Sequence, residues 1–169
     1  GLVIPPRLAP IHVVIVPIYR KDDEKVAVLE AAVRIADELR SDGLTVELDD
    51  REGMKPGAKY YEWERKGVPM RLEIGPRDLE GKCVMSKMRI AEVGENGRAV
   101  KEKLDWEGLG AAVGQRLDAF QTELYNRALA RRQESEIEID SWDEFVEAFA
   151  DGKSRFVWAH WDGTQATEL

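Results

Sequence analysis

Charged side chains with complementary hydrogen-bonding roles are concentrated between Asp49 and Arg89, around two Gly/Pro turns. An arginine can donate to the ring acceptors of guanine, and a carboxylate can accept from its ring N–H and amino group. This combination of residue types therefore favours recognition of an unpaired base. The candidate residues are Glu64, Arg71, Arg77, Asp78, Lys87 and Arg89.

The same cluster is also compatible with a solvent-exposed network of ion pairs, which needs no ligand. Tyr60, Tyr61 and Trp63 lie on a predicted helix beside it and could stack on a base. At helical spacing, aromatic residues more often belong to a core. The pattern by itself leaves both interpretations open.

No catalytic or metal-binding constellation is evident. His12 and His160 lie far apart, and neither accompanies a nucleophile in a recognisable setting. Cys83 is the single cysteine, which excludes an intramolecular disulfide and a multi-cysteine metal site. Asp49-Asp50 is a carboxylate pair typical of a strand end, with a metal or acid–base role as the less favoured interpretation.

Hydrophobic periodicity and Gly/Pro punctuation predict an α/β layer with a mostly parallel sheet and an antiparallel edge. Neither a dinucleotide-binding glycine fingerprint nor a phosphate-binding GKS/T loop occurs. We predict strands at 11–18, 44–49, 70–74 and 82–89, and helices at 22–42, 58–66 and 109–133. A second, smaller α+β segment is predicted from an acidic strand near 134–140, a helix capped by Ser141 and a strand at 155–161.

Composition restricts the possible partners. The chain has 169 residues, 34% of them charged, and a net charge of −8. Residues 1–90 carry nearly balanced charge and the remainder carries the negative excess, so a polyanion is expected to contact the first half. No run of 18 apolar residues is present, which argues against a membrane partner. The lone cysteine fits a reducing cytoplasmic location.

Several motifs resemble the archaeal/eukaryote-like prolyl-tRNA synthetases, a class II family. They include DDR followed by PGAKYYEWERKGVPMRLEIGPRDLEG, and LDAFQTELYNRAL on the predicted long helix. The opening GLVIPPRLAPIHVVIVPI resembles the junction between catalytic motif 3 and the anticodon-binding domain. We therefore expect residues 1–10 to be a catalytic-domain remnant or linker, 11–133 an anticodon-binding domain, and 134–169 part of a C-terminal domain.

The resemblance implies a mixed five-stranded sheet flanked by helices, which reads the two guanines of the proline anticodon. It assigns base contacts to Glu64, Arg71, Arg77 and Asp78, and it leaves Lys87 and Arg89 as less specific candidates. The complete enzyme would be a homodimer that uses ATP and Mg²⁺ to attach proline to its tRNA. The present chain lacks that catalytic core, and we expect it to be catalytically inactive and to need no cofactor.

The C-terminal segment departs from the zinc-binding pattern of this family. Asp162 and Thr167 stand where zinc-binding members carry cysteine-containing sequence, so no thiolate zinc site is expected. Two alternatives to the synthetase interpretation are an accessory module that binds RNA without catalysis, and a generic α/β ligand-binding domain whose charges form only a surface network.

Overall fold

The chain forms two compact units, residues 1–122 and residues 123–169. A computed structural model describes residues 1–95, 97, 99–152, 154–161 and 163. Asp162 and Thr167, which bear on the zinc comparison, lie outside the described residues. None of the helices in the described part of the chain is both long and apolar enough to cross a bilayer.

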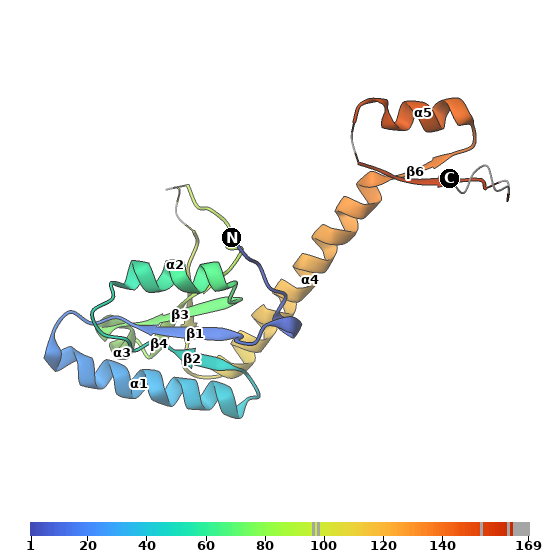
Figure 1. The fold of residues 1–169 in the computed structure, drawn as a ribbon. Helices are drawn as coiled ribbons and strands as arrows, with labels where there is room; N and C mark the ends of the chain where they lie inside the picture. Colours follow the sequence, from blue (N-terminus) through green and yellow to red (C-terminus); the bar gives the residue numbers. More distant parts are fainter. Residues whose placement is uncertain (96, 98, 153, 162, 164–169) are drawn as a thin grey trace. The chain divides into compact units, whose positions relative to one another are not determined.

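The first unit contains a five-stranded mixed sheet in the order β2-β1-β3-β4-β5 (Figure 1). Strands β2 and β3 run parallel to β1, whereas β4 and β5 continue the sheet in antiparallel pairs. The strands are β1 (Val13–Pro17), β2 (Val46–Leu48), β3 (Met70–Ile74), β4 (Cys83–Met88) and β5 (Glu102–Asp105). The helical elements of this unit are η1 (Pro6–Leu8), α1 (Asp22–Ser41), α2 (Pro56–Lys66), α3 (Pro76–Glu80) and the first part of α4 (Leu109–Ser135).

The main hydrophobic core lies between one face of the sheet and helices α1 and α4. Alternate residues of β3 enter this core as Met70, Leu72 and Ile74, and all three are fully buried. Helix α1 contributes Ile35 and Leu39 from its apolar stripe. Because side chains alternate across a strand, the intervening residues of β3 must face the other side of the sheet.

Helix α2 packs on that other side, chiefly over β1. Val14 and Val16 of β1 form a small core with Trp63 of α2 and with Val68, which follows the helix. The charged residues of β3 and β4 lie on the same face of the sheet, beyond this small core. Helix α2 thus ends beside a polar part of the sheet and can bring its own side chains to it.

The mixed five-stranded sheet confirms the predicted fold class, but β5, α3 and the short helix η1 are absent from the elements predicted residue by residue. Strand β5 was not predicted, because only Leu104 among its four residues is buried and the others are charged and exposed. The segment between β3 and β4, which begins with the Gly75-Pro76 turn signal, forms the short helix α3. Its first residue is Pro76, and the Asp78 carboxylate accepts from the N–H of Gly75.

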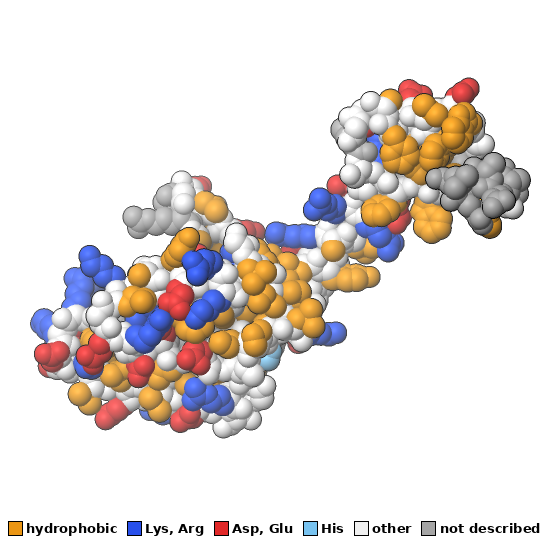
Figure 2. Space-filling view, in the orientation of Figure 1, with side chains coloured by type: hydrophobic (Ala, Val, Ile, Leu, Met, Phe, Trp, Pro, Cys, Tyr) orange, Lys and Arg blue, Asp and Glu red, His pale blue; other side chains and the backbone are white. Residues whose placement is uncertain are grey.

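The second unit contains β6 (Glu136–Ile139), α5 (Trp142–Ala150) and β7 (Phe156–Ala159), and the two strands pair in parallel. Ser141 caps α5, as the sequence predicts. Several large apolar side chains of this unit are exposed. They include Trp142, Val146, Phe149, Phe156, Trp158 and Trp161. Figure 2 shows hydrophobic side chains gathered on the visible face of this unit. The domain boundaries at 10/11 and 133/134 stay predictions.

The contact between α4 and the end of α1 can be tested at Gly110. A Cβ at Gly110 would lie 1.6 Å from Asp42 Oδ2 and 2.7 Å from its Cγ, so Asp42 would have to change rotamer. We expect Gly110→Ala to lower the free energy of unfolding by about 1 kcal/mol or more. Gly114 on the same helix has open space around it. Gly114→Ala should instead raise this free energy by about 0.5–1 kcal/mol, measured by urea denaturation. Equal effects of the two substitutions would contradict the close contact.

Candidate nucleic-acid interface

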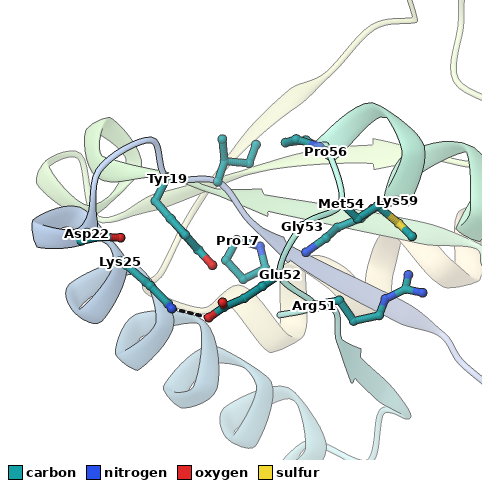
Figure 3. A pocket seen from close by; sticks show the side chains of 11 residues that line it. Pro17, Tyr19, Asp22, Lys25, Arg51, Glu52, Gly53, Met54, Pro56 and Lys59 are labelled. Carbon is teal, nitrogen blue, oxygen red and sulfur yellow. Dashed lines mark hydrogen bonds and ion pairs between the residues drawn. The ribbon is translucent and has the colours of Figure 1, made fainter.

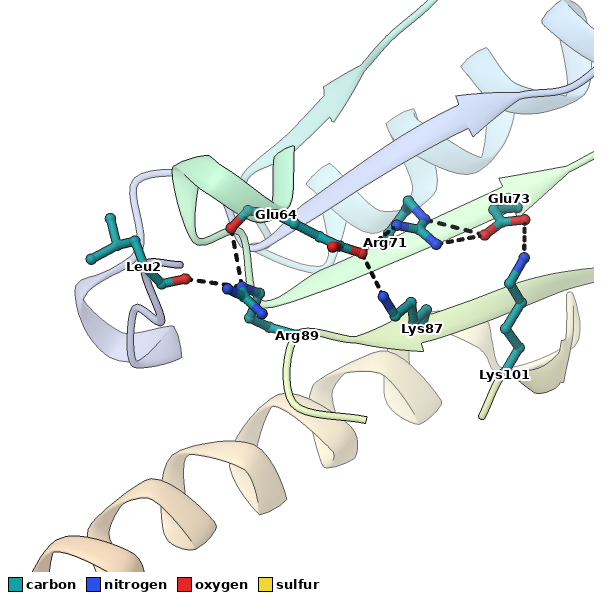
Figure 4. A network of polar contacts seen from close by, with 7 residues as sticks. All are labelled: Leu2, Glu64, Arg71, Glu73, Lys87, Arg89 and Lys101. Carbon is teal, nitrogen blue, oxygen red and sulfur yellow. Dashed lines mark hydrogen bonds and ion pairs between the residues drawn. The ribbon is translucent and has the colours of Figure 1, made fainter. Parts of the chain in front are cut away.

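Three of the predicted site residues meet where α2 ends beside the sheet (Figure 4). Glu64 lies in the last turn of α2, Arg71 on β3, and Lys87 directly opposite Arg71 on β4. The carboxylate oxygen Oε1 of Glu64 accepts from Arg71 Nη1 at 3.0 Å and from Lys87 Nζ at 2.5 Å. Burial alone would raise the pKa of Glu64, but Lys87 and then Arg71 hold that pKa below its ordinary value. The carboxylate is therefore ionised at neutral pH and bridges two cations.

Arg71 is buried although it carries a charge. Only 7% of the residue is exposed, and its guanidinium carbon lies 3.6 Å from the centre of the Tyr60 ring. Its Nε and Nη2 both donate to Glu73 Oε1, at 3.1 and 2.9 Å. Lys101 in turn donates to Glu73 Oε2 at 2.7 Å. The planar donor group is thus held from its side, its face and its end.

Sequence reasoning overlooked Glu73, Lys101 and the role of Tyr60 in this network. The alternation in MRLEI carries a usable signal for Glu73, because it places residues 71 and 73 on the same face of one strand. No comparable local signal connects Lys101 to Glu73, since 28 residues separate them in the chain.

Arg89 lies just beyond β4 and binds backbone rather than the carboxylates. Its Nε donates to the carbonyl oxygens of Leu2 at 2.9 Å and of Glu64 at 3.1 Å. Gly67, with φ of 79°, ends α2 and lets the N-terminal segment approach closely, because a Cβ there would lie 2.9 Å from Ile4 Cγ1. Arg89 therefore joins the N-terminal segment to the last turn of α2, beside Glu64.

Arg77 and Asp78 occupy α3, beyond the opposite end of β3 from Glu64. The side chain of Arg77 is exposed. The Asp78 carboxylate accepts from Gly75 N at 2.8 Å and lies 3.9 Å from Cys83 Sγ, at the start of β4. Within the described part of the chain, no hydrogen bond or ion pair joins these two residues to the Glu64 cluster. The structure thus brings together Glu64, Arg71, Lys87 and Arg89, and separates Arg77 and Asp78 from them.

Asp49 holds α2 against the sheet. Its buried carboxylate accepts from Arg51 at 2.7 and 2.8 Å and from the indole N–H of Trp63 at 2.7 Å, and it lies 3.4 Å from Lys59 Nζ. Burial would raise the pKa of Asp49, but Arg51, Trp63 and Lys59 together hold it well below its ordinary value. The first aspartate of the DDR motif therefore has a structural role in positioning the helix that carries Glu64.

The remaining candidate groups have mainly structural surroundings. Trp63 belongs to the core, whereas Tyr61 is 68% exposed. His12 Nδ1 accepts from Thr45 N at 3.1 Å. Cys83 is buried at the start of β4, and burial raises the pKa of its thiol. Among the described residues, no group of three or more His, Cys, Asp or Glu side chains is arranged to hold a metal ion.

A larger hollow of about 260 Å³ lies at the carboxyl end of β1 (Figure 3). Lys25 of α1 and Glu52 of the loop before α2 form an ion pair in its wall. Arg51 and Lys59 also line it, but both are already bound to Asp49. Its cations are therefore neutralised by neighbouring carboxylates. The hollow beside Glu64, Arg71 and Lys87 is much smaller, about 10 Å³.

The Glu64 cluster can both donate and accept hydrogen bonds on the face of the sheet over β3 and β4, where buried contacts hold it in place. Residues 12–116 match the family described as Anticodon binding domain, and the chain therefore belongs to that family.

Curated relatives named Proline--tRNA ligase align with nearly the whole chain. It is 42% identical over 168 residues to a Proline--tRNA ligase of Porphyromonas gingivalis, which covers 99% of this chain and 32% of the relative. A Roseiflexus castenholzii Proline--tRNA ligase is 43% identical over 159 residues, covering 94% of this chain and 32% of the relative. A Proline--tRNA ligase, chloroplastic/mitochondrial, of Arabidopsis thaliana is 39% identical over 170 residues, covering 99% and 30%. The chain thus spans about a third of the length of these relatives.

The role of Asp49 predicts a specific effect on stability. Asp49→Asn should lower the free energy of unfolding by about 3 kcal/mol, because it leaves the buried Lys59 ammonium without its anion. The adjacent Asp50 is exposed. Asp50→Asn should change this free energy by less than about 0.5 kcal/mol in the same urea titration.

The pH dependence of that stability follows from the lowered pKa of Asp49. Asp49 contributes stability above the ordinary carboxyl pKa of about 4, and this contribution is lost as the pH falls further and the folded protein binds the proton. Stability of the wild type should therefore decline more steeply below pH 4 than that of Asp49→Asn. Parallel pH profiles for the two proteins would rule out the assigned role.

Proposed function

We propose that the first unit recognises the anticodon of proline tRNA, as part of a proline–tRNA ligase. The observation that carries this proposal is the cluster of Glu64, Arg71 and Lys87, which presents an acceptor and two cationic donors on one face of the sheet in an anticodon-binding fold. Proline is proposed as the amino acid because the relatives are named Proline--tRNA ligase.

Guanine has the hydrogen-bonding groups that match this cluster. Its O6 and N7 accept from Arg71 and Lys87, and its N1–H and amino group donate to Glu64. In the free protein the three side chains satisfy one another and leave a hollow of only about 10 Å³, at the lower limit for holding one water. A base binds by replacing these internal bonds with its own. Since bonds are exchanged rather than added, the gain is mainly specificity for guanine.

Arg77 and Asp78 are proposed to contact the second guanine of the anticodon. They lie at the other end of β3, where Arg77 is exposed and the Asp78 carboxylate lies near the surface. Separate subsites suit two adjacent bases that are unstacked from one another, as in single-stranded RNA recognition. Arg89 is proposed to support the first subsite through its backbone contacts.

The complete protein is proposed to join proline to its tRNA with ATP and Mg²⁺, and to act as a homodimer in the cytoplasm. In that protein the 169-residue chain would supply anticodon recognition, while a separate catalytic domain would carry the chemistry. The proposal for this chain alone is RNA binding without catalysis.

The test is binding of a proline anticodon stem-loop to the 169-residue chain, beside a stem-loop in which both guanines are adenines. The wild type should prefer the guanine-containing RNA. Arg71→Lys keeps the charge but loses the planar fork. It should reduce that preference by about 5- to 150-fold, the equivalent of one base contact of about 1–3 kcal/mol. Fluorescence anisotropy at a fixed salt concentration gives both affinities.

Arg34→Lys provides a matched control, because Arg34 is exposed on α1 and lies over Trp106 instead of the candidate site. It should leave the guanine preference unchanged. Equal affinity of the wild-type chain for the two stem-loops would reject anticodon reading and favour a surface ion-pair network.

A further inference from the structure

Glu73 is a buried carboxylate that contacts the main donor of the candidate site. Only 5% of the residue is exposed, and its two oxygens have separate partners. Oε1 accepts both Nε and Nη2 of Arg71, and Oε2 accepts Lys101 Nζ (Figure 4). Glu73 is two residues from Arg71 on the same strand and face, so strand geometry fixes the distance between them.

These contacts determine which part of the Arg71 guanidinium is available. A guanidinium has five N–H donors in a fixed plane, and Nε–H with one Nη2–H forms one edge of that plane. Glu73 occupies this edge. The Tyr60 ring covers one face at 3.6 Å. The N–H groups not bound by Glu73 lie at the Nη1/Nη2 end of the guanidinium, where Nη1 donates to Glu64 at 3.0 Å.

We infer that Glu73 is a positioning residue for base recognition: by holding the Nε/Nη2 edge of Arg71, it leaves only the Nη1/Nη2 end to meet guanine. This inference rests on the proposed function and concerns the same site. Glu73 itself does not touch the base. It restricts Arg71 to a single orientation before RNA arrives, so less side-chain entropy is lost on binding.

The charge of Glu73 is maintained by its partners. Burial would raise the pKa of Glu73, but Lys101 and Arg71 hold it below its ordinary value. Glu73 is therefore an anion at neutral pH and makes charge-assisted hydrogen bonds, which are stronger than neutral ones. An ionised partner can thus hold the guanidinium while a base competes for its other end.

Two substitutions separate positioning from general stability. Glu73→Ala removes the acceptor and frees the Arg71 edge, whereas Glu73→Gln retains one oxygen that can accept from Nε and Nη2. We expect Glu73→Ala to reduce the guanine-over-adenine preference about tenfold and Glu73→Gln to reduce it less than about threefold. Both are measured with the two stem-loops described above, together with thermal unfolding.

Glu102→Ala is the matched control. Glu102 also pairs with an arginine, Arg116, but it belongs to β5 and lies on the opposite face of the sheet from Arg71. It should leave the preference intact. Loss of affinity for both stem-loops to the same extent in Glu73→Ala would overturn the inference, because a purely structural residue would act in that way. An unchanged preference in Glu73→Ala would overturn it as well.

Nuclear magnetic resonance of the wild-type chain tests the inference even if Glu73→Ala does not fold. The Arg71 Nε–H signal, assigned by its loss in Arg71→Lys, should exchange slowly with water and keep its position when the guanine stem-loop is added. The exposed Arg77 gives the fast-exchanging reference. Fast exchange of Arg71 Nε–H in the free chain, or a large shift of this signal on RNA binding, would refute positioning by Glu73.

The two hypotheses fail in distinguishable ways. A wild-type chain without guanine preference rejects the proposed function, whatever the behaviour of the Arg71 signal. A wild-type chain with guanine preference that survives Glu73→Ala leaves the proposed function standing and rejects only the role of Glu73.

Discussion

The buried carboxylate of Asp49 is the interaction on which the candidate site depends. It joins three groups from the loop before α2 and from α2 itself, and it follows directly after β2. Since Trp63 is one residue from Glu64 along the helix, the Asp49–Trp63 hydrogen bond also sets the position of Glu64 over β3. The single buried anion of Asp49 thus fixes both the packing of α2 on the sheet and the place of Glu64 in the candidate site.

Much of the fold could be predicted from the sequence because its signals are local. The β-branched run of β1, the amphipathic stripe of α1 and the alternation in β3 each depend on neighbouring residues. Strand β5 could not be predicted, because three of its four residues are charged and only Leu104 is buried, which is not a strand pattern. Its pairing with β4 stabilises it instead. In the candidate site, too, local signals could be predicted and long-range ones could not. Arg71 and Lys87 could be selected by type, but their alignment depends on strand register.

The charges of the site are balanced within the protein. Arg71 has two carboxylate partners, and Lys87 and Lys101 each share one of these carboxylates. In a chain with a net charge of −8, this arrangement gives little general attraction for polyanions. Under the proposed function, discrimination between RNAs would therefore depend on the geometry of a few donors and acceptors, with little contribution from overall charge.

The bifurcated contact of Arg89 has a mechanical consequence. One N–H lies between the carbonyl oxygens of Leu2 and Glu64, so the same side chain binds both the N-terminal segment and the last turn of α2. A displacement of either segment alters the bond to the other. One arginine side chain thus links the first residues of the chain to the helix turn that carries Glu64, and a shift of those residues is expected to change the position of that turn.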